Sequence, residues 1–427
     1  MHREPRSTRA ALRSGRHLLI ALFVLAMSPA ALPAQEKTGA PAAAPPPLTL
    51  DECLALTTNK QPALAAARAS LAAAEDGRQA LDNLPLFARA LSRELPIRKE
   101  QACLGVTIAN ALLLQAEWEA RYAVTRNFFS ITYARMQLKL LTDVLEDLDK
   151  ARKKTEKLLK AGNPDFKVTQ LDLDLFDVNI DILKARQAEA RVGVDRAFAA
   201  LREAIGIGPD YPLDIVHAEL PPRVASLDRA ALIQLALSNR GEIVQANAAR
   251  TVTALEVDAQ ASHLFGLKVD TFGRAADIHA QPIPQGQANG EYRPGAIGLE
   301  MPNTLVGKRG DRVARASDLS QRATAVVDKA FNLVALETDS NYLKWLEARD
   351  RYDKLAGVLP KAQTLKVRSY KRLEDGNAPG AEYIQTATLV DQIQAQKNEQ
   401  LYLHALALAA LERVTAGGYR IYPTKQP

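Results

Sequence analysis

The sequence has few cysteines, few aromatic residues and little net charge beyond its first residues. Cys53 and Cys103 are its only cysteines, too few for a disulfide scaffold and wrongly spaced for a metal site. Aromatic residues make up 5% of the 427 residues, whereas alanine and leucine dominate, which favours long helices over strands. Five arginines and one glutamate near the N-terminus supply +4 of the formal charge of +6, so +2 remains for the rest. This balance gives no indication of nucleic-acid binding.

Motifs that carry catalysis are also missing. The sequence holds no HExxH, GxSxG or CxxC motif. The run VGKRG at 306–310 lacks the earlier glycine and the Ser or Thr after lysine that a phosphate loop needs. The acidic cluster Asp172, Asp174, Asp177 and Asp181 is interpreted as a solvated helix face rather than a metal site. We therefore expect that the protein is not an enzyme and that it has no catalytic residues, cofactor or metal ion.

The N-terminal 34 residues have the pattern of a secretory signal peptide. An arginine-rich start is followed by an apolar run, residues 18–27, and by small residues ending near Ala34. The apolar run is too short to span a membrane as a helix. Residues 35–47 form an Ala/Pro-rich tether with no core of its own. The sequence therefore predicts an exported protein with a cleaved signal.

The region from Val168 to Leu201 has two apolar seams at helical spacing. A heptad repeat indicates a helix that packs against a neighbour, and two seams indicate a neighbour on each side. This pattern suits the wall of a helical cylinder, although the core helix of an ordinary bundle also has a wide apolar face. The predicted helix, Asp165–Ala204, would be about 60 Å long, which favours the cylinder. The first seam contains Val168, Leu171, Leu175, Val178, Ile182, Ala185, Val192 and Ala199, and the second Leu173, Phe176, Ile180, Leu183, Ala190, Val194, Ala197 and Leu201.

The chain repeats its own plan. The passage that begins LTLDECLAL, with a capping-box spacing between Thr49 and Glu52, has an echo in SLDRAALIQLALSNRGEI. Setting Pro62 against Gly241 aligns the apolar positions of the two passages. The turns at Gly162 and Gly376 each follow a charged helix and precede another long helix. We therefore expect two structural repeats, residues 48–222 and 223–427.

One part of the second half departs from helical composition. Residues 262–308 are rich in glycine and proline, and two stretches in them alternate apolar and polar residues. This pattern predicts a β-hairpin at about 266–305.

Together these features resemble the TolC family of outer-membrane efflux proteins. The resemblance lies in the LTLDECLAL…NKQPAL opening, its copy around NRGEI, the two glycine turns and the passage PGAIGLEMPNTLVGKRGDRVARA. It implies a mainly α protein with a small β part, whose long antiparallel helices form an α-helical barrel in a trimer. It further implies a β-barrel in the outer membrane, a periplasmic adaptor protein and an inner-membrane pump as partners, and a passive export duct.

The first half differs from the family in one place. Family members carry a β-hairpin between the first two long helices, but residues 83–114 show no pair of alternating strands, and 102–114 resembles a buried helix. Strands in 83–114 would favour an outer-membrane channel. A helix there would favour a periplasmic helical scaffold that has lost the membrane-spanning part.

The resemblance also implies a gate at the periplasmic end of the duct. By alignment to the second glycine turn, Glu382 and Gln385 occupy the two acidic positions of the family's gate. Tyr383 and Arg372 are near enough to take the places of its tyrosine and arginine. An acidic residue in the first turn of a helix is equally explained by the helix dipole.

Overall fold

The computed structural model describes residues 46–85, 92–217, 219–221, 223–262, 305 and 307–422, which lie in the second of two units, 45–427. The described residues form eight helices in two matched sets. The lengths run 11, 21, 67 and 36 residues in the first set and 11, 22, 66 and 35 in the second. The prediction of two helical repeats is confirmed. The helices are α1 (Leu50–Lys60), α2 (Pro62–Asp82), α4 (Leu95–Ala161), α5 (Gln170–Ile205), α6 (Arg229–Asn239), α7 (Gly241–Ser262), α9 (Arg309–Glu374) and α10 (Gly380–Val414).

Local sequence signals set most helix ends. Thr49 and Glu52 form the expected capping box, in which the Glu52 carboxylate accepts from the Thr49 N–H at 2.7 Å. Pro62 opens α2, where its missing N–H costs least. The predicted start of the long helix at Asp165 was five residues too early. Thr169 is in an extended conformation and donates to the Asp172 carboxylate, so α5 begins at Gln170.

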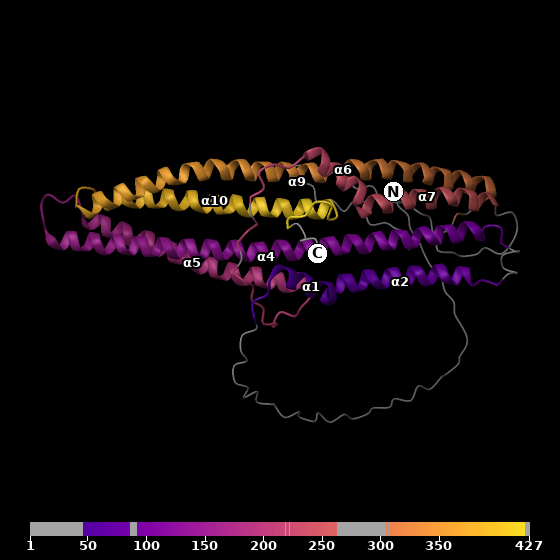
Figure 1. The fold of residues 1–427 in the computed structure, drawn as a ribbon, viewed down its shortest axis with the longest axis horizontal. Helices are drawn as coiled ribbons and strands as arrows, with labels where there is room; N and C mark the ends of the chain where they lie inside the picture. The colour runs from indigo at the N-terminus through magenta and orange to yellow at the C-terminus, as the bar shows by residue number, and fades with distance from the viewer. Residues whose placement is uncertain are drawn as a thin grey trace, which may run out of the picture. The chain divides into compact units, whose positions relative to one another are not determined.

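The long helices α4 and α9 each run past a pair of shorter helices. α9 packs against α10 and α7, which follow one another along it, and α4 packs against both of these as well as against α5 and α2 (Figure 1). The end of α5 meets the start of α2, where the Gln61 amide donates to the carbonyls of Glu203 at 3.2 Å and Ala204 at 2.9 Å. At the end of the bundle that contains α5 and α10, the helices therefore pack in the order α5, α4, α10, α9. Helices α5 and α9 lie at the two edges.

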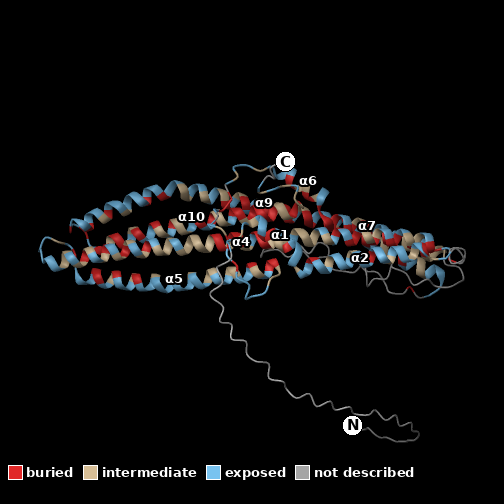
Figure 2. Ribbon diagram, turned by 60° about the horizontal axis from the view of Figure 1, so that its bottom comes forward, coloured by how far each residue is buried: buried red, intermediate tan, exposed pale blue. Residues whose placement is uncertain are grey.

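Apolar clusters lie between these helices along their length. Buried residues follow α4, α10 and the facing side of α9, whereas exposed residues cover much of α5 and α2 (Figure 2). A buried chain of ion pairs joins Arg240, Glu337 on α9 and Arg413 on α10. The described β structure is a parallel bridge between Leu48 and Ile215.

Several sequence predictions fall outside the described residues. The signal peptide, most of the tether and the hairpin predicted at about 266–305, apart from Leu305, cannot be compared with the structure. The prediction that 102–114 is helical is confirmed, because these residues belong to α4. Since α2 ends at Asp82 and α4 begins at Leu95, only residues 83–94 lie between them. No helix within the described ranges combines the length and apolarity needed to cross a membrane.

Candidate functional site

The candidate site is the helical tip, defined here as the two turns, 162–169 and 375–379, with the helix ends beside them. The turns lie against each other. The Lys167 N–H donates to the Gly376 carbonyl at 2.9 Å. The Phe166 ring occupies the space beside Gly376, so that a Cβ there would lie 2.3 Å from the ring. Gly376 also has a φ of 73°, which favours glycine. The two repeats therefore touch at their turns.

Asp172 connects the two turns through one carboxylate. Its Oδ2 accepts from the N–H and the hydroxyl of Thr169, each at 2.9 Å, and its Oδ1 accepts from the N–H of Ala381 at 3.1 Å. One negative charge thus lies at the N-termini of both α5 and α10, where helix dipoles favour it. Asp172 is only 3% exposed, so its interpretation as part of a solvated face was wrong. The reason is that Ala381, its partner, lies more than 200 residues away in the chain.

The other three aspartates of that cluster are exposed, as predicted. Asp177 pairs across the helices with Arg152 on α4, whose Nε donates at 2.5 Å. This hydrogen bond lowers the pKa of Asp177 from its ordinary value.

The four predicted gate residues do not form one cluster. Arg372 at the end of α9 donates to Glu382 in the first turn of α10 at 2.6 Å, and this ion pair is partly exposed. Tyr383 is instead buried against Tyr370 and Phe176, with ring centroids 5.3 and 6.4 Å away. Its burial raises the pKa of its hydroxyl. Gln385 is exposed on the outside of α10.

A polar contact farther along the helices from the tip was missed by sequence reasoning. Lys366 on α9 binds Asp147 on α4 at 2.9 Å. Burial raises the pKa of Asp391 on α10 to about 6, with nearby Lys366 opposing the shift and Asp147 adding to it. No local spacing predicts this group, because its members come from three helices.

Comparison with known proteins gives matches among solved structures. No protein-family model matches the chain, and no curated protein sequence matches it. The outer-membrane channel OprN is 16% identical, with a TM-score of 0.69 over 87% of this chain and 90% of that one. The outer-membrane protein VceC of Vibrio cholerae is 13% identical, with a TM-score of 0.67 over 87% and 97% of the two chains. The MtrE outer-membrane channel of Neisseria gonorrhoeae is 14% identical, with a TM-score of 0.59 over 87% and 89%. This chain has the TolC-type fold.

The TolC-type fold leaves one of the two predicted seams of α5 without a partner in the protomer. The second seam is largely buried against the neighbouring helices, as at Ile180, which is 7% exposed. Most of the first seam faces outward, with Leu171 66% exposed and Ile182 49% exposed, while Val168 is buried and Leu175 partly buried in the same cluster as Ile180. At the other edge, α9 exposes apolar residues on one face as well, namely Leu336, Leu343, Val358 and Leu365. The packed helices of the single chain therefore expose an apolar stripe at each edge.

Proposed function

We propose that this protein is the outer-membrane channel component of a tripartite efflux or export system and works as a passive duct across the periplasm. Three copies would form the duct, and a periplasmic adaptor and an inner-membrane pump would be its partners. The protein would be exported by a cleaved signal peptide. As a passive duct it would make or break no covalent bond in what it transports. The compared structures support it, because OprN and MtrE are described as outer-membrane channels.

The observation that carries the proposal is the pair of apolar edges. α5 and α9 lie at opposite edges of the packed helices, and their exposed stripes differ in sequence. A contact between two different edges repeats head to tail, and it closes into a ring if the rotation allows. The exposed seam of α5 against the α9 stripe of a second copy would bury both. A ring of such contacts has a central passage lined by helices.

The helical tip would be the periplasmic gate of the duct. Arg372 and Glu382 join α9 to α10 there, and they are the part of the predicted gate set that supports this role best. Tyr383 would contribute by packing inside the tip, and Gln385 by its exposed position near the mouth.

A second candidate function is a periplasmic helical scaffold, and one observation favours it. A membrane-crossing β-strand takes about 9–11 residues, so two strands and a turn need roughly 20. Residues 83–94, between α2 and α4, are too few for this. The first half would then add no hairpin to a membrane-spanning structure, and only the segment 263–308 has the required length.

Membrane extraction separates the two functions. The full-length protein would be expressed with its own leader, and washed outer membranes would be extracted with carbonate and with urea. A channel stays in the membrane pellet through both treatments, and cross-linking in the membrane gives a trimer. Release of the protein into the supernatant would reject the channel and support the scaffold.

A further inference from the structure

Four of the described helices begin or end at the opposite end from the helical tip, where α2 ends at Asp82 beside the three that matter here. α4 begins at Leu95, α7 ends at Ser262 and α9 begins at Arg309 (Figure 1). The last turns of α7 and the first turn of α9 are called the roots here, because the segment 263–308 leaves from the one and returns to the other.

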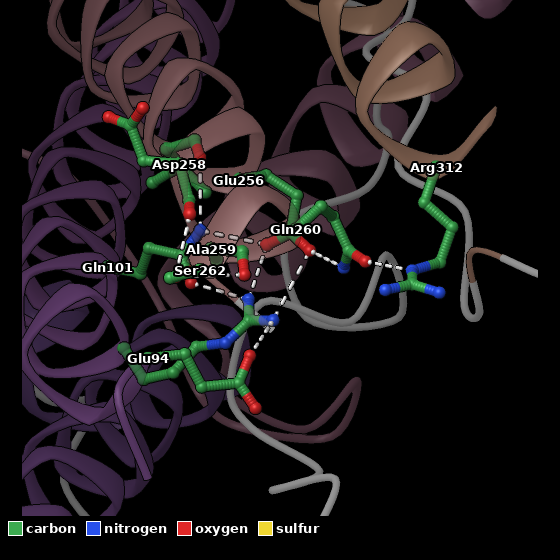
Figure 3. Close-up of polar contacts among 10 residues, drawn as sticks. Glu94, Gln101, Glu256, Asp258, Ala259, Gln260, Ser262 and Arg312 are labelled. Carbon is green, nitrogen blue, oxygen red and sulfur yellow. Dashed lines mark hydrogen bonds and ion pairs between the residues drawn. The ribbon is translucent and has the colours of Figure 1, made fainter. Parts of the chain in front are cut away.

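Arg98, in the first turn of α4, joins that helix to the root on α7. Its Nη2 donates to Glu94 at 3.1 Å, its Nη1 donates to Gln101 at 2.8 Å, and both nitrogens donate to the Glu256 carboxylate. Gln101 also donates to Glu256 at 3.0 Å and to the Val252 carbonyl at 3.1 Å. The ionic side chains are at most 12% exposed. Figure 3 shows Glu94, Gln101 and Glu256 converging on one guanidinium.

The contact continues from α7 to the root on α9. Gln260, one turn after Glu256, donates to its Oε1 at 2.7 Å. Arg312 then donates through Nε to Gln260 Oε1 at 2.9 Å, and through Nη1 to the Gly307 carbonyl at 2.9 Å. In Figure 3 Gln260 lies between Glu256 and Arg312. One polar chain therefore connects α4, α7 and the start of α9.

The two arginines hold the same place in the two repeats. Arg98 is the fourth residue of α4, and Arg312 is the fourth residue of α9. Both side chains reach α7, at acceptors one helical turn apart. Helix α7 is thus held by a matching arginine from each long helix.

The corresponding helix of the first half lacks these acceptors. Counted from Pro62 and Gly241, the positions of Glu256 and Gln260 in α7 match Gly77 and Leu81 in α2. Glycine has no side chain and the leucine side chain is apolar, so neither position offers a hydrogen-bond acceptor. The arrangement therefore belongs to the helix that leads into the long segment 263–308, and not to the one that leads into the short connection 83–94.

We propose that Arg98 and Arg312 are positioning residues that hold both roots of the segment 263–308 at fixed places against α4. A buried ion pair adds little net stability compared with an apolar replacement, whereas loss of one partner leaves a buried charge. The hydrogen bonds of Arg98 do fix the position of α7 against α4, because the guanidinium has to meet three acceptors at once. Helix α4 of the first half therefore sets the positions of the two helix ends between which the segment 263–308 runs.

Hydrogen–deuterium exchange of the full-length protein in detergent tests this role. The measured amides are those of 253–262 at the end of α7 and 309–316 at the start of α9, with 384–394 of α10 as a distant reference. Arg98→Met should speed exchange in both roots by about tenfold or more, because the buried Glu256 carboxylate loses the Arg98 guanidinium that pairs with it. Gln260→Ala, at a partly buried side chain, should speed exchange in 309–316 more than in 253–262.

Lys99→Met is the matched control. Lys99 is the next residue of α4, but it pairs with Asp82 of α2 at 2.8 Å, within the first half. It should leave exchange in both roots unchanged. Equal acceleration in the roots and in α10, or acceleration of α4 alone in Arg98→Met, would overturn the proposal. The proposal would also be overturned if Lys99→Met sped exchange in the roots as much as Arg98→Met does. The same holds if Gln260→Ala left the exchange rate in 309–316 unchanged.

Discussion

At the scale of single residues, His404 has a defined proton state in the core. The indole N–H of Trp345 donates to His404 Nε2 at 3.0 Å. Because an indole N–H is a donor only, His404 Nε2 accepts, and the neutral ring carries its proton on Nδ1. His404 is 1% exposed, so water cannot replace this partner. A second proton on the ring would place two N–H groups against each other.

We predict that His404 makes the fold less stable in acid. Burial lowers its pKa below the ordinary value of about 6.5. The Val224 carbonyl and Asp353 oppose the shift, and the charges of Arg223 and Arg349 add to it. The unfolded chain then binds a proton below pH 6.5 that the folded protein refuses, so stability falls as pH drops below that value and is unaffected above it.

The measurement is the urea midpoint at pH 8 and pH 5.5 in the parent and in His404→Gln. The glutamine amide oxygen can still accept from Trp345 but does not titrate, so the variant should lose less stability in acid. Asp391 acts in the opposite direction. Its raised pKa of about 6 gives stability that is present in acid and lost as pH rises through 6. This contribution of Asp391 is the same in the parent and in His404→Gln, so it does not affect the comparison. An identical pH dependence in the two proteins would contradict the role of His404.

The two turn glycines give a second residue-scale prediction. Gly162 and Gly376 both have positive φ, 64° and 73°, so alanine should cost about 1 kcal/mol at either position. A Cβ at Gly162 meets nothing within 4 Å, whereas at Gly376 it would overlap the Phe166 ring. Gly376→Ala should therefore lower the urea midpoint more than Gly162→Ala. Equal losses would mean that Phe166 moves away freely.

At the scale of elements, the two seams of α5 predict different outcomes for neighbouring substitutions. Ile180 is buried within the protomer, and Ile182 is half exposed on the outer seam. Ile180→Asp places a charge in the core and should destabilise the protomer by several kcal/mol. Ile182→Asp should leave the protomer folded but prevent self-association.

Light scattering in detergent and the urea midpoint separate these effects. The parent should be an oligomer and Ile182→Asp a folded monomer with an unchanged midpoint. An oligomeric Ile182→Asp variant would show that the outer seam is not the contact between copies.

At the scale of the whole molecule, the ion pair between Arg372 and Glu382 predicts a gating effect without a stability effect. A partly exposed pair contributes about 0–1 kcal/mol to stability, so Arg372→Ala should unfold at nearly the same urea concentration. If the pair helps to keep the helical tip closed, the variant should have a higher ion conductance in planar bilayers than the parent.

Arg351→Ala is its control. Arg351 forms an exposed pair with Glu347 on the same helix, so its loss frees no helix from another. Parent-like conductance of both Arg372→Ala and Glu382→Ala would exclude this pair from the gate.

The sequence alone determined the elements and their repetition, because the interactions that define them are local. The capping box of Thr49 and Glu52 marks the start of α1, and Gly162 ends α4 in the left-handed conformation that glycine adopts most readily. The seams of α5 follow from a 3.6-residue period, and the match of Pro62 with Gly241 predicted the two sets of helices.

The tertiary structure alone decided which of these faces has a partner. Both seams of α5 look alike in sequence, but the second is buried against α4 and α10 at Phe176 and Ile180, whereas most of the first is exposed, because packing order depends on contacts between distant segments. The same reason applies to Asp172, which binds an amide of the other repeat, and to Arg98, which meets Glu256. Tyr383 and Glu382 are neighbours in the chain, yet successive residues of a helix point about 100° apart. One therefore lies in the core of the helical tip, and the other pairs with Arg372 at its surface.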